Sequence, residues 1–272
     1  MLKLRIITAL VLIPVFTGAV WFLNTPTFAL LMSLVIAQGA WEWSGLSKDR
    51  DILPRALYVM MTLGVLSLLY FYQSQTLVYV IMLLMLGWWL IALLQIVRFQ
   101  KSGQYILQMP LLLTGLLVLA PAWFCLIQLH DKEPQGPQLV LFVLILIWSA
   151  DIAAYFSGRR WGRKKLASQV SPGKSWEGVY GALCAAVLIG LAYAVIEKYE
   201  GLNIVFFILI SIITVAASIL GDLLESLLKR RSDRKDSGSL LPGHGGVLDR
   251  IDSLTAALPI FFCSMSLWEK AM

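Results

Sequence analysis

The residues best suited to chemistry lie in one polar stretch near the C-terminus, between positions 221 and 252. Four polar side chains recur there at helical spacing: Asp222, Glu225, Ser226 and Lys229. Spacings of three and four residues place them on one face of a helix. We expect this charged face to continue a bilayer helix into the cytoplasm, where its carboxylates could hold a hard cation such as Mg²⁺.

A second acidic pair, Asp249 and Asp252, stands where the next helix is predicted to begin, and its spacing again gives one shared face. Carboxylates brought together from two helix ends repel one another, and a bound cation relieves that repulsion. Mg²⁺ typically takes one or two protein carboxylates and completes its coordination with substrate phosphates and water. Because ionisable groups at bilayer depth are costly, Asp222 and Asp249 are the acids that structure alone explains least well.

The sequence between these acidic pairs is rich in cations and glycine. Lys and Arg can neutralise phosphate oxygens, and the run Pro-Gly-His-Gly-Gly at 242–246 can wrap around a ligand because glycine accepts a positive φ. The pattern indicates a metal-assisted phosphate site at the membrane surface. For Lys229–Arg231 alone, membrane topology and contact with anionic lipid is the simpler interpretation. His244 could be a metal ligand, a phosphate donor or a turn-stabilising residue, and without a second His or Cys nearby a zinc site is not expected.

Another polar segment covers residues 157–178. Asp151 and Tyr155 stand one helical turn apart just before it. The stretch Ser-Pro-Gly-Lys-Ser at 171–175 looks like part of a phosphate-binding loop, but it lacks the Gly-x4-Gly-Lys spacing and a preceding strand, so a Walker motif is rejected. We expect a Pro-Gly turn that opens a helix at Trp176 and presents backbone N–H groups to an anion.

These polar segments need a scaffold, and the composition predicts a membrane one. Of 272 residues, 59% are hydrophobic and 14% are charged, whereas an average soluble domain has about 45–50% and about 25%. We expect an all-α, polytopic integral membrane protein with about nine transmembrane helices of roughly 17–25 residues. The predicted spans are Ile6–Leu23, Phe28–Trp43, Ala56–Tyr72, Leu77–Ile96, Pro110–Leu129, Leu139–Phe156, Val179–Ile196, Ile204–Leu224 and Ile251–Leu267.

The distribution of Lys and Arg predicts the orientation. With a cytoplasmic N-terminus, all of the 22 basic residues fall in inside loops except Lys132, Lys198 and Lys270. Both long polar segments then face the cytoplasm and the C-terminus lies outside. The same asymmetry accounts for the net charge of +6, so nucleic acid is not an expected partner.

The chain divides into N-terminal transmembrane helices, residues 1–138, and a catalytic half, residues 139–272. The spans Val179–Ile196 and Ile204–Leu224 are joined by a short outside turn, so they should form an antiparallel hairpin that returns both polar segments to one face. Glu42 lies between two tryptophans at the end of the second span, and it is open to both a structural and a functional interpretation.

The C-terminal stretch also resembles a known signature. Its pattern is Ser226-x-Leu228-Lys229-Arg230-x4-Lys235-Asp236-x-Gly238-x2-Leu241-Pro242-x-His244-Gly245-Gly246-Val247-x-Asp249-Arg250-Ile251-Asp252. This is similar to the bacterial type of the phosphatidate cytidylyltransferase family, also called CDP-diacylglycerol synthase. The stretch Ser171–Gly178 resembles that family too, although many members have Thr where Ser175 stands. The specific resemblance covers roughly residues 151–252.

The resemblance implies a reaction in which CTP and phosphatidic acid give CDP-diacylglycerol and pyrophosphate in phospholipid biosynthesis. It implies Mg²⁺, with K⁺ as a second cation, a homodimer, and a place in the cell inner membrane. It also implies that the metals lie near Asp222, Ser226 and Asp249.

The residues and the resemblance together predict three groups of site residues. Catalytic roles are expected for Asp222, Lys229, Arg230, His244, Asp249 and Asp252. Substrate contacts are expected from Asp151, Tyr155, Lys165, Ser171, Lys174, Glu177, Lys235, Asp236, Gly245, Gly246 and Arg250. Metal contacts are expected from Asp222, Ser226 and Asp249.

Two other functional classes are compatible with parts of this pattern. A CTP-dependent membrane lipid kinase, acting on a polyprenol or similar alcohol, would release CDP and would need a base to activate a hydroxyl. A transporter could use Asp151, Asp222 and Asp249 in an ion pathway, but transporters usually place such groups near the bilayer midplane between repeated halves. Here the acids stand at one face and no internal repeat is visible.

Overall fold

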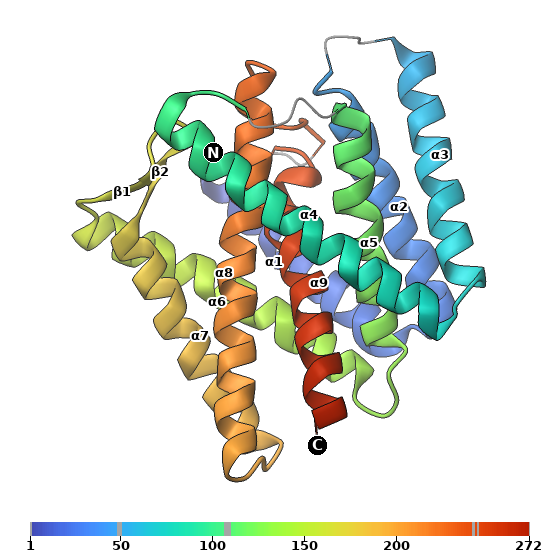
Figure 1. The fold of residues 1–272 in the computed structure, drawn as a ribbon, viewed down its shortest axis with the longest axis vertical. Helices are drawn as coiled ribbons and strands as arrows, with labels where there is room; N and C mark the ends of the chain where they lie inside the picture. Colours follow the sequence, from blue (N-terminus) through green and yellow to red (C-terminus); the bar gives the residue numbers. More distant parts are fainter. Residues whose placement is uncertain (1, 48–50, 106–109, 241–242, 244, 272) are drawn as a thin grey trace.

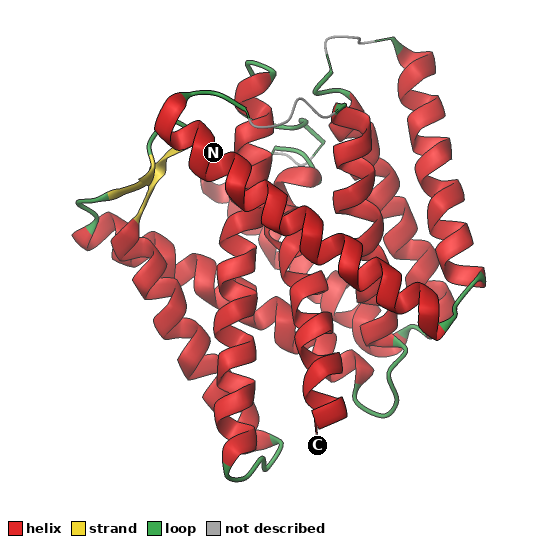
Figure 2. Cartoon of the chain, viewed as in Figure 1, coloured by secondary structure: helices red, strands yellow, loops and turns green. Residues whose placement is uncertain are grey.

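The computed structural model of the chain describes residues 2–47, 51–105, 110–240, 243 and 245–271. These residues form nine α-helices and a two-stranded hairpin, as Figures 1 and 2 show. The elements are α1 (Leu2–Phe22), α2 (Thr25–Ser44), α3 (Ile52–Phe71), α4 (Gln75–Ser102), α5 (Leu111–His130), α6 (Gly136–Trp161), β1 (Lys165–Ala167), β2 (Ser171–Ser175), α7 (Trp176–Ile196), α8 (Leu202–Arg231) and α9 (Leu248–Ala271). The predicted all-α membrane fold is confirmed.

Every predicted span coincides with one of these helices, and seven of them are long and apolar enough to cross a membrane. α1 is not among these seven, but it contains a shorter apolar stretch, Leu10–Phe22. Several helices extend beyond the predicted spans at the end that carries the polar segments. α6 continues to Trp161 and α8 to Arg231, so part of what the sequence suggested as loop is helix. The charged face of α8 is therefore a direct extension of an apolar helix, as predicted.

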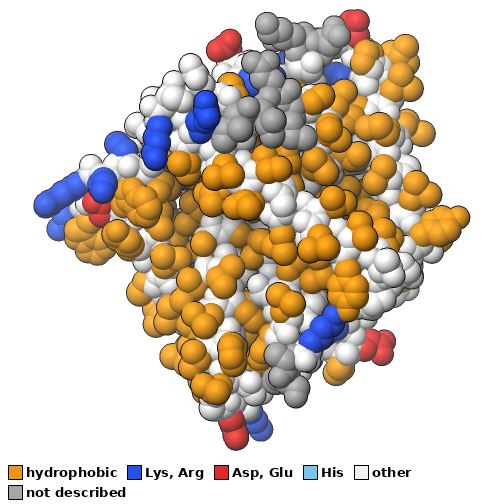
Figure 3. Space-filling view, viewed as in Figure 1, with side chains coloured by type: hydrophobic (Ala, Val, Ile, Leu, Met, Phe, Trp, Pro, Cys, Tyr) orange, Lys and Arg blue, Asp and Glu red, His pale blue; other side chains and the backbone are white. Residues whose placement is uncertain are grey.

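The helices differ in how much protein covers them. In α5 and α9, 61% and 56% of the most apolar 18-residue stretch is buried inside the protein, compared with 17% in α3. α8 packs against both α7 and α9, and α6 packs along α7. The central helices therefore make most of the helix–helix contacts. α3 and most of α4 present apolar side chains outward, seen as the orange surface in Figure 3.

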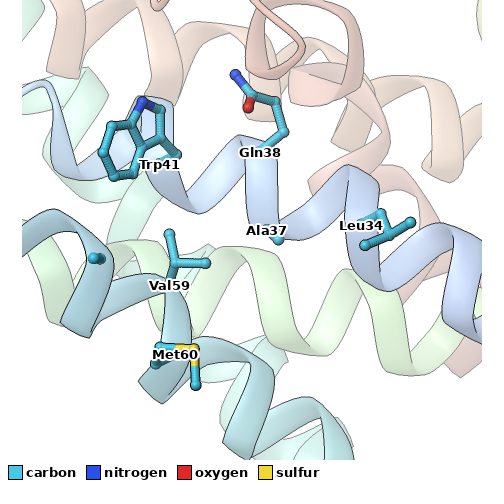
Figure 4. Close-up of a pocket in the computed structure, with 7 residues that line it drawn as sticks. Leu34, Ala37, Gln38, Trp41, Val59 and Met60 are labelled. Carbon is cyan, nitrogen blue, oxygen red and sulfur yellow. The ribbon is translucent and has the colours of Figure 1, made fainter.

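An apolar hollow of about 380 Å³ lies between α2 and α3 (Figure 4). Its lining residues are Leu34, Ala37, Gln38, Trp41, Ala56, Val59 and Met60. Gln38 brings an amide group to this otherwise apolar lining, and it reappears below as a neighbour of Glu42.

The polar segments gather at one end of the bundle. In Figure 1 the hairpin, the end of α8 and the start of α9 all lie in the upper part of the view, and the turn between α7 and α8 lies at the bottom with the C-terminus. Figure 3 shows Lys and Arg side chains concentrated over the hairpin at the upper left. α7 and α8 thus form the predicted antiparallel pair, and it brings both polar segments to the same end.

Candidate active site

Lys229, on the last turns of α8, connects that helix to the first turn of α9. Its ammonium nitrogen lies 3.0 Å from Glu225 Oε2 and 2.8 Å from Asp249 Oδ1. The two acidic side chains are only 3% and 6% exposed. Charges buried this deeply are tolerated when they are paired and hydrogen-bonded. The predicted shared face from Asp222 to Lys229 is confirmed, as is the position of Asp249 at the beginning of a helix.

Asp249 also organises the described part of the segment between α8 and α9, residues 232–240, 243 and 245–247, which we name the signature loop. Its carboxylate accepts hydrogen bonds from the backbone N–H groups of Ser237, at 3.1 and 3.2 Å, and Gly246, at 2.7 Å. Gly245 has a φ of +82°, and a Cβ there would lie 2.6 Å from Asp249 Oδ2. The loop therefore needs glycine at 245, both for its backbone conformation and for the approach of the carboxylate.

Asp222 meets the other polar segment. Its Oδ2 atom forms an ion pair with Lys174 Nζ at 2.6 Å, and Ser226 donates a hydrogen bond to Oδ1 at 3.3 Å. The two charged side chains are 29% and 26% exposed, so solvent and ligands can reach them. The two predicted polar segments, about fifty residues apart in the chain, thus come into direct contact.

The β-hairpin is the element that positions Lys174. β1 and β2 pair antiparallel, with Lys165 opposite Ser175 and Ala167 opposite Ser171. Ala167 in β1 and Val170 in the turn of the hairpin are buried, and Arg230 on α8 donates to the Val170 carbonyl at 3.4 Å. These contacts dock the hairpin on α8 and hold Lys174 at the acidic face.

α7 begins at Trp176, as predicted, and two side chains stabilise its start. The Ser175 hydroxyl accepts a hydrogen bond from the Gly178 N–H at 3.2 Å, which is a typical N-cap. Glu177, in the first turn, accepts hydrogen bonds from the Lys164 N–H. Its negative charge also suits the positive end of the helix dipole. Glu177, predicted to contact substrate, therefore has a structural role in closing the hairpin.

The expected Pro-Gly turn is wrong. Pro172 and Gly173 lie within β2, and the turn of the hairpin covers residues 168–170. A strand, β1, does precede the stretch 171–175, contrary to the sequence prediction. The rejection of a Walker motif still holds, because the Gly-x4-Gly-Lys spacing is missing.

Further acids surround Asp222. Asp151 on α6 interacts electrostatically with Asp222, Lys174 and Arg250. Asp252 on α9 interacts with both Asp222 and Glu225. Glu225 Oε1 is buried beside the Asp252 carboxyl, and among the described residues no N–H or hydroxyl group donates to it. Two acid groups this close need a shared proton or a nearby cation.

The oxygen-rich set around Asp222 suits a hard cation such as Mg²⁺. Within the described residues no three Asp, Glu, His or Cys side chains converge on one point as a complete protein ligand set. Mg²⁺ commonly needs only one or two carboxylates, with phosphate and water as the remaining ligands. Asp222, partly exposed, is the more open of the two carboxylates among the three predicted ligands, because Asp249 already accepts from Lys229 and two backbone N–H groups.

The other predicted residues occupy several positions. Lys165, Lys235, Asp236 and Arg250 are exposed around the acidic face, and Ser171 is partly buried in β2. Tyr155 is exposed on α6, where its hydroxyl accepts a hydrogen bond from Arg159 at 2.8 Å. His244 lies outside the described residues, so its role stays a prediction.

Glu42 is the acid whose importance the sequence left open. It comes from α2, yet it is only 3% exposed and accepts hydrogen bonds from the signature loop and the start of α9. The available signal was its position, an acid between Trp41 and Trp43 in an apolar segment, since such acids are costly unless they have a purpose. Nothing in the spacing indicated that its partners lie some two hundred residues away.

Comparison with known proteins identifies similar chains over nearly the whole length. A family model described as the cytidylyltransferase family matches residues 3–268. A phosphatidate cytidylyltransferase of Pseudomonas aeruginosa is 45% identical over 262 residues, which is 96% of each chain. Proteins of the same name from Haemophilus influenzae and Brucella suis are 40% and 36% identical, covering 96% of this chain and 97% and 92% of their own lengths.

Proposed function

The chain belongs to the cytidylyltransferase family, and from this membership we propose that it transfers CMP from CTP to phosphatidic acid, giving CDP-diacylglycerol and pyrophosphate. It is a nucleotidyltransferase of phospholipid biosynthesis. The single observation that supports assigning the reaction to this site is the Lys174–Asp222 ion pair, because it joins the hairpin to α8.

The chemistry requires little acid–base catalysis. A phosphatidate phosphate is largely ionised near neutral pH, since the second pKa of such phosphates is about 6. One of its oxygens attacks the α-phosphorus of CTP, and the bond from that phosphorus to the bridging oxygen of pyrophosphate breaks. Positioning and charge stabilisation supply most of the catalysis in phosphoryl transfer, and we extend that argument to nucleotidyl transfer.

The described residues can supply both the positioning and the charge stabilisation. Lys174 and Arg250 stand at the accessible acidic face and can bind phosphate oxygens. Lys229 is already held by Glu225 and Asp249, so it fixes the geometry of the two helix ends. Asp222, with Ser226 beside it, would hold Mg²⁺ together with one of the neighbouring acids, and the cation would neutralise phosphate charge. K⁺ as a second cation remains part of the proposal on the family resemblance alone.

A lipid substrate explains the location of the site. The phosphate of phosphatidic acid lies at the membrane surface, and the carboxylates of α8 and α9 lie at the ends of helices long enough to span the bilayer. We place the enzyme in the bacterial inner membrane, with this face and the N-terminus in the cytoplasm, because the Lys and Arg residues gather there. A homodimer completes the proposal, and crosslinking in native membranes would test it.

Product analysis tests the function. The purified protein is incubated with CTP, phosphatidic acid and Mg²⁺, and pyrophosphate and CDP-lipid are measured in equal amounts. An Asp222→Asn variant is the inactive control, and Asp233→Asn, an exposed loop residue whose φ of +53° asparagine also adopts, is the matched active control. Release of CDP with a phosphorylated alcohol would instead support the lipid kinase.

A further inference from the structure

We propose that Glu42 is a positioning residue of the active site, whose carboxylate on α2 holds the signature loop and the first turn of α9 in their reactive arrangement. This inference rests on the proposed function, because it assigns the same site a further residue. Among the described residues no hydrogen bond or ion pair joins Glu42 to the hairpin or to Asp222, so we assign it an action through the loop and not on the substrates.

The burial and the partners of Glu42 are the first observation. The side chain is only 3% exposed, and no ion pair of the described residues includes it. A buried carboxylate is costly unless hydrogen bonds compensate its charge. It accepts four of them, from Gln38 Nε2 at 3.0 Å, Ser237 Oγ at 3.1 Å, Val247 N at 3.0 Å and Leu248 N at 2.8 Å.

Two of these donors belong to the beginning of α9. The Val247 and Leu248 N–H groups are among those that a helix N-terminus leaves without intrahelical partners. The positive end of the helix dipole also favours a carboxylate there. Glu42 thus supplies, from another helix, the cap for the helix that carries Asp249 and Asp252.

Glu42 and Asp249 hold the same parts of the loop. Ser237 gives its hydroxyl to Glu42 and its N–H to Asp249. Gly246 gives its N–H to Asp249, and the next residue gives its N–H to Glu42. Because the two carboxylates share these attachment points, a change at Glu42 is transmitted to the donors that orient Asp249.

The close fit of the loop around Glu42 supports this role. A Cβ at Gly246 would lie 2.3 Å from Glu42 Oε2, and a Cβ at Gly238 would lie 2.6 Å from Glu42 Oε1. Neither glycine has a positive φ among those recorded, so the approach of the carboxylate, and not the backbone conformation, excludes a side chain. The closeness of Glu42 therefore accounts for the need for glycine at position 246, which the sequence predicts to contact substrate.

Glu42→Gln is the sharpest test, because it keeps the shape and replaces one acceptor oxygen with an NH2 group that faces N–H donors. We expect kcat for CDP-lipid formation to fall by about tenfold or more, the loss typical of a hydrogen bond to a charged group. The Mg²⁺ concentration for half-maximal rate should rise, while the KM for phosphatidic acid should not change. Glu42→Asp, which keeps the charge on a shorter side chain, should retain an intermediate rate.

Two controls and a second readout separate positioning from folding. Glu197→Gln changes a partly exposed acid at the opposite end and should behave as the unchanged protein does. Gln38→Ala removes the donor to Glu42 that comes from α2 itself and belongs to neither the loop nor α9, so its effect should be less than that of Glu42→Gln. Amide hydrogen exchange should become faster at residues 237 and 246–248 in Glu42→Gln, a result that does not depend on activity.

An unchanged rate and Mg²⁺ dependence in Glu42→Gln would overturn the proposal. The proposal would also fail if the rate fell while the Mg²⁺ dependence and the amide exchange in the loop stayed unchanged. A smaller amount of folded protein would lower the rate without altering either property. If the unmodified protein formed no CDP-lipid, the proposed function would fail, and the exchange data would still decide whether Glu42 holds the loop.

Discussion

Replacing Lys174 by alanine tests whether the hairpin takes part in the reaction. In the structure the ammonium group pairs with Asp222 Oδ2 at 2.6 Å, with each side chain only about a quarter exposed. We infer that CTP phosphates draw Lys174 away from Asp222 and that a cation takes its place on the carboxylate. Lys174→Ala should therefore reduce the use of CTP although the signature itself is intact.

The magnitude follows from the kind of contact that is lost. A hydrogen bond to a charged group contributes about 1.5–3 kcal/mol, which corresponds to about ten- to a hundred-fold in kcat/KM. The ion pair with Asp222 must break before Lys174 reaches a phosphate, and this offsets part of the gain. We therefore expect the loss in kcat/KM for CTP to lie near the lower end, at about tenfold.

Initial rates at varied CTP and varied Mg²⁺ provide the measurement. Because Lys174 competes with a cation for Asp222, its removal should not raise the Mg²⁺ concentration for half-maximal rate. Lys164→Ala is the matched control, since that exposed hairpin lysine uses its backbone N–H and carbonyl in the structure. If Lys174→Ala matched this control, and Ser171→Ala also left the CTP dependence unchanged, the hairpin would have no catalytic part and our reasoning would be wrong.

Further predictions concern the acids, the loop and the topology. Asp222→Asn should nearly abolish turnover while folded protein remains in the membrane, and the same is expected of Asp249→Asn; near-normal rates in steady-state assays would refute the assignment. Chelation by EDTA should stop the reaction and added Mg²⁺ should restore it, whereas activity that persists in EDTA would exclude an exchangeable catalytic cation. Gly246→Ala should lower thermal stability in detergent by about 1–3 kcal/mol, as overpacking does, because its Cβ would overlap Glu42 Oε2; an unchanged melting temperature would contradict that packing. A cysteine at Ser232, in a background without native cysteines, should resist an impermeant reagent added outside intact cells, and rapid labelling would reverse the topology.

The membrane helices could be predicted because each corresponds to one continuous apolar segment of the sequence. Long apolar segments specify spans by length alone, and spacings of three and four predict the shared face of Asp222 and Lys229. The start of α7 at Trp176 and a helix that begins around Asp249 also follow from local patterns. Local signals failed at β2, where Pro172 and Gly173 look like a turn. The strand pairs with the neighbouring β1, and the hairpin is held by α8, which follows much later in the chain.

Glu42 shows the same limit within the site. Its residue type and its two tryptophan neighbours predicted a costly acid in an apolar setting, but not the donors that compensate it. Three of its four donors are 195 to 206 residues away, and the packing of α2 beside α9 brings them together. The division at residue 138 stays a prediction, yet the N-terminal part contributes through Glu42 to the geometry of the catalytic part.

The arrangement of charges indicates how the site can accept two anionic substrates. Acids and cations lie close together around α8 and α9, and three buried acids are bound internally: Glu225 and Asp249 by Lys229, and Glu42 by backbone N–H groups. The accessible pair is Lys174 and Asp222. A phosphate oxygen can take the lysine and a cation can take the carboxylate, so one ion pair yields two ligand sites without leaving either charge uncompensated. The buried pairs keep the helix ends fixed during this exchange, because their partners are out of reach of solvent. We therefore propose that catalysis depends on the buried ion pairs, which stay fixed, and on the Lys174–Asp222 pair, which exchanges its partners.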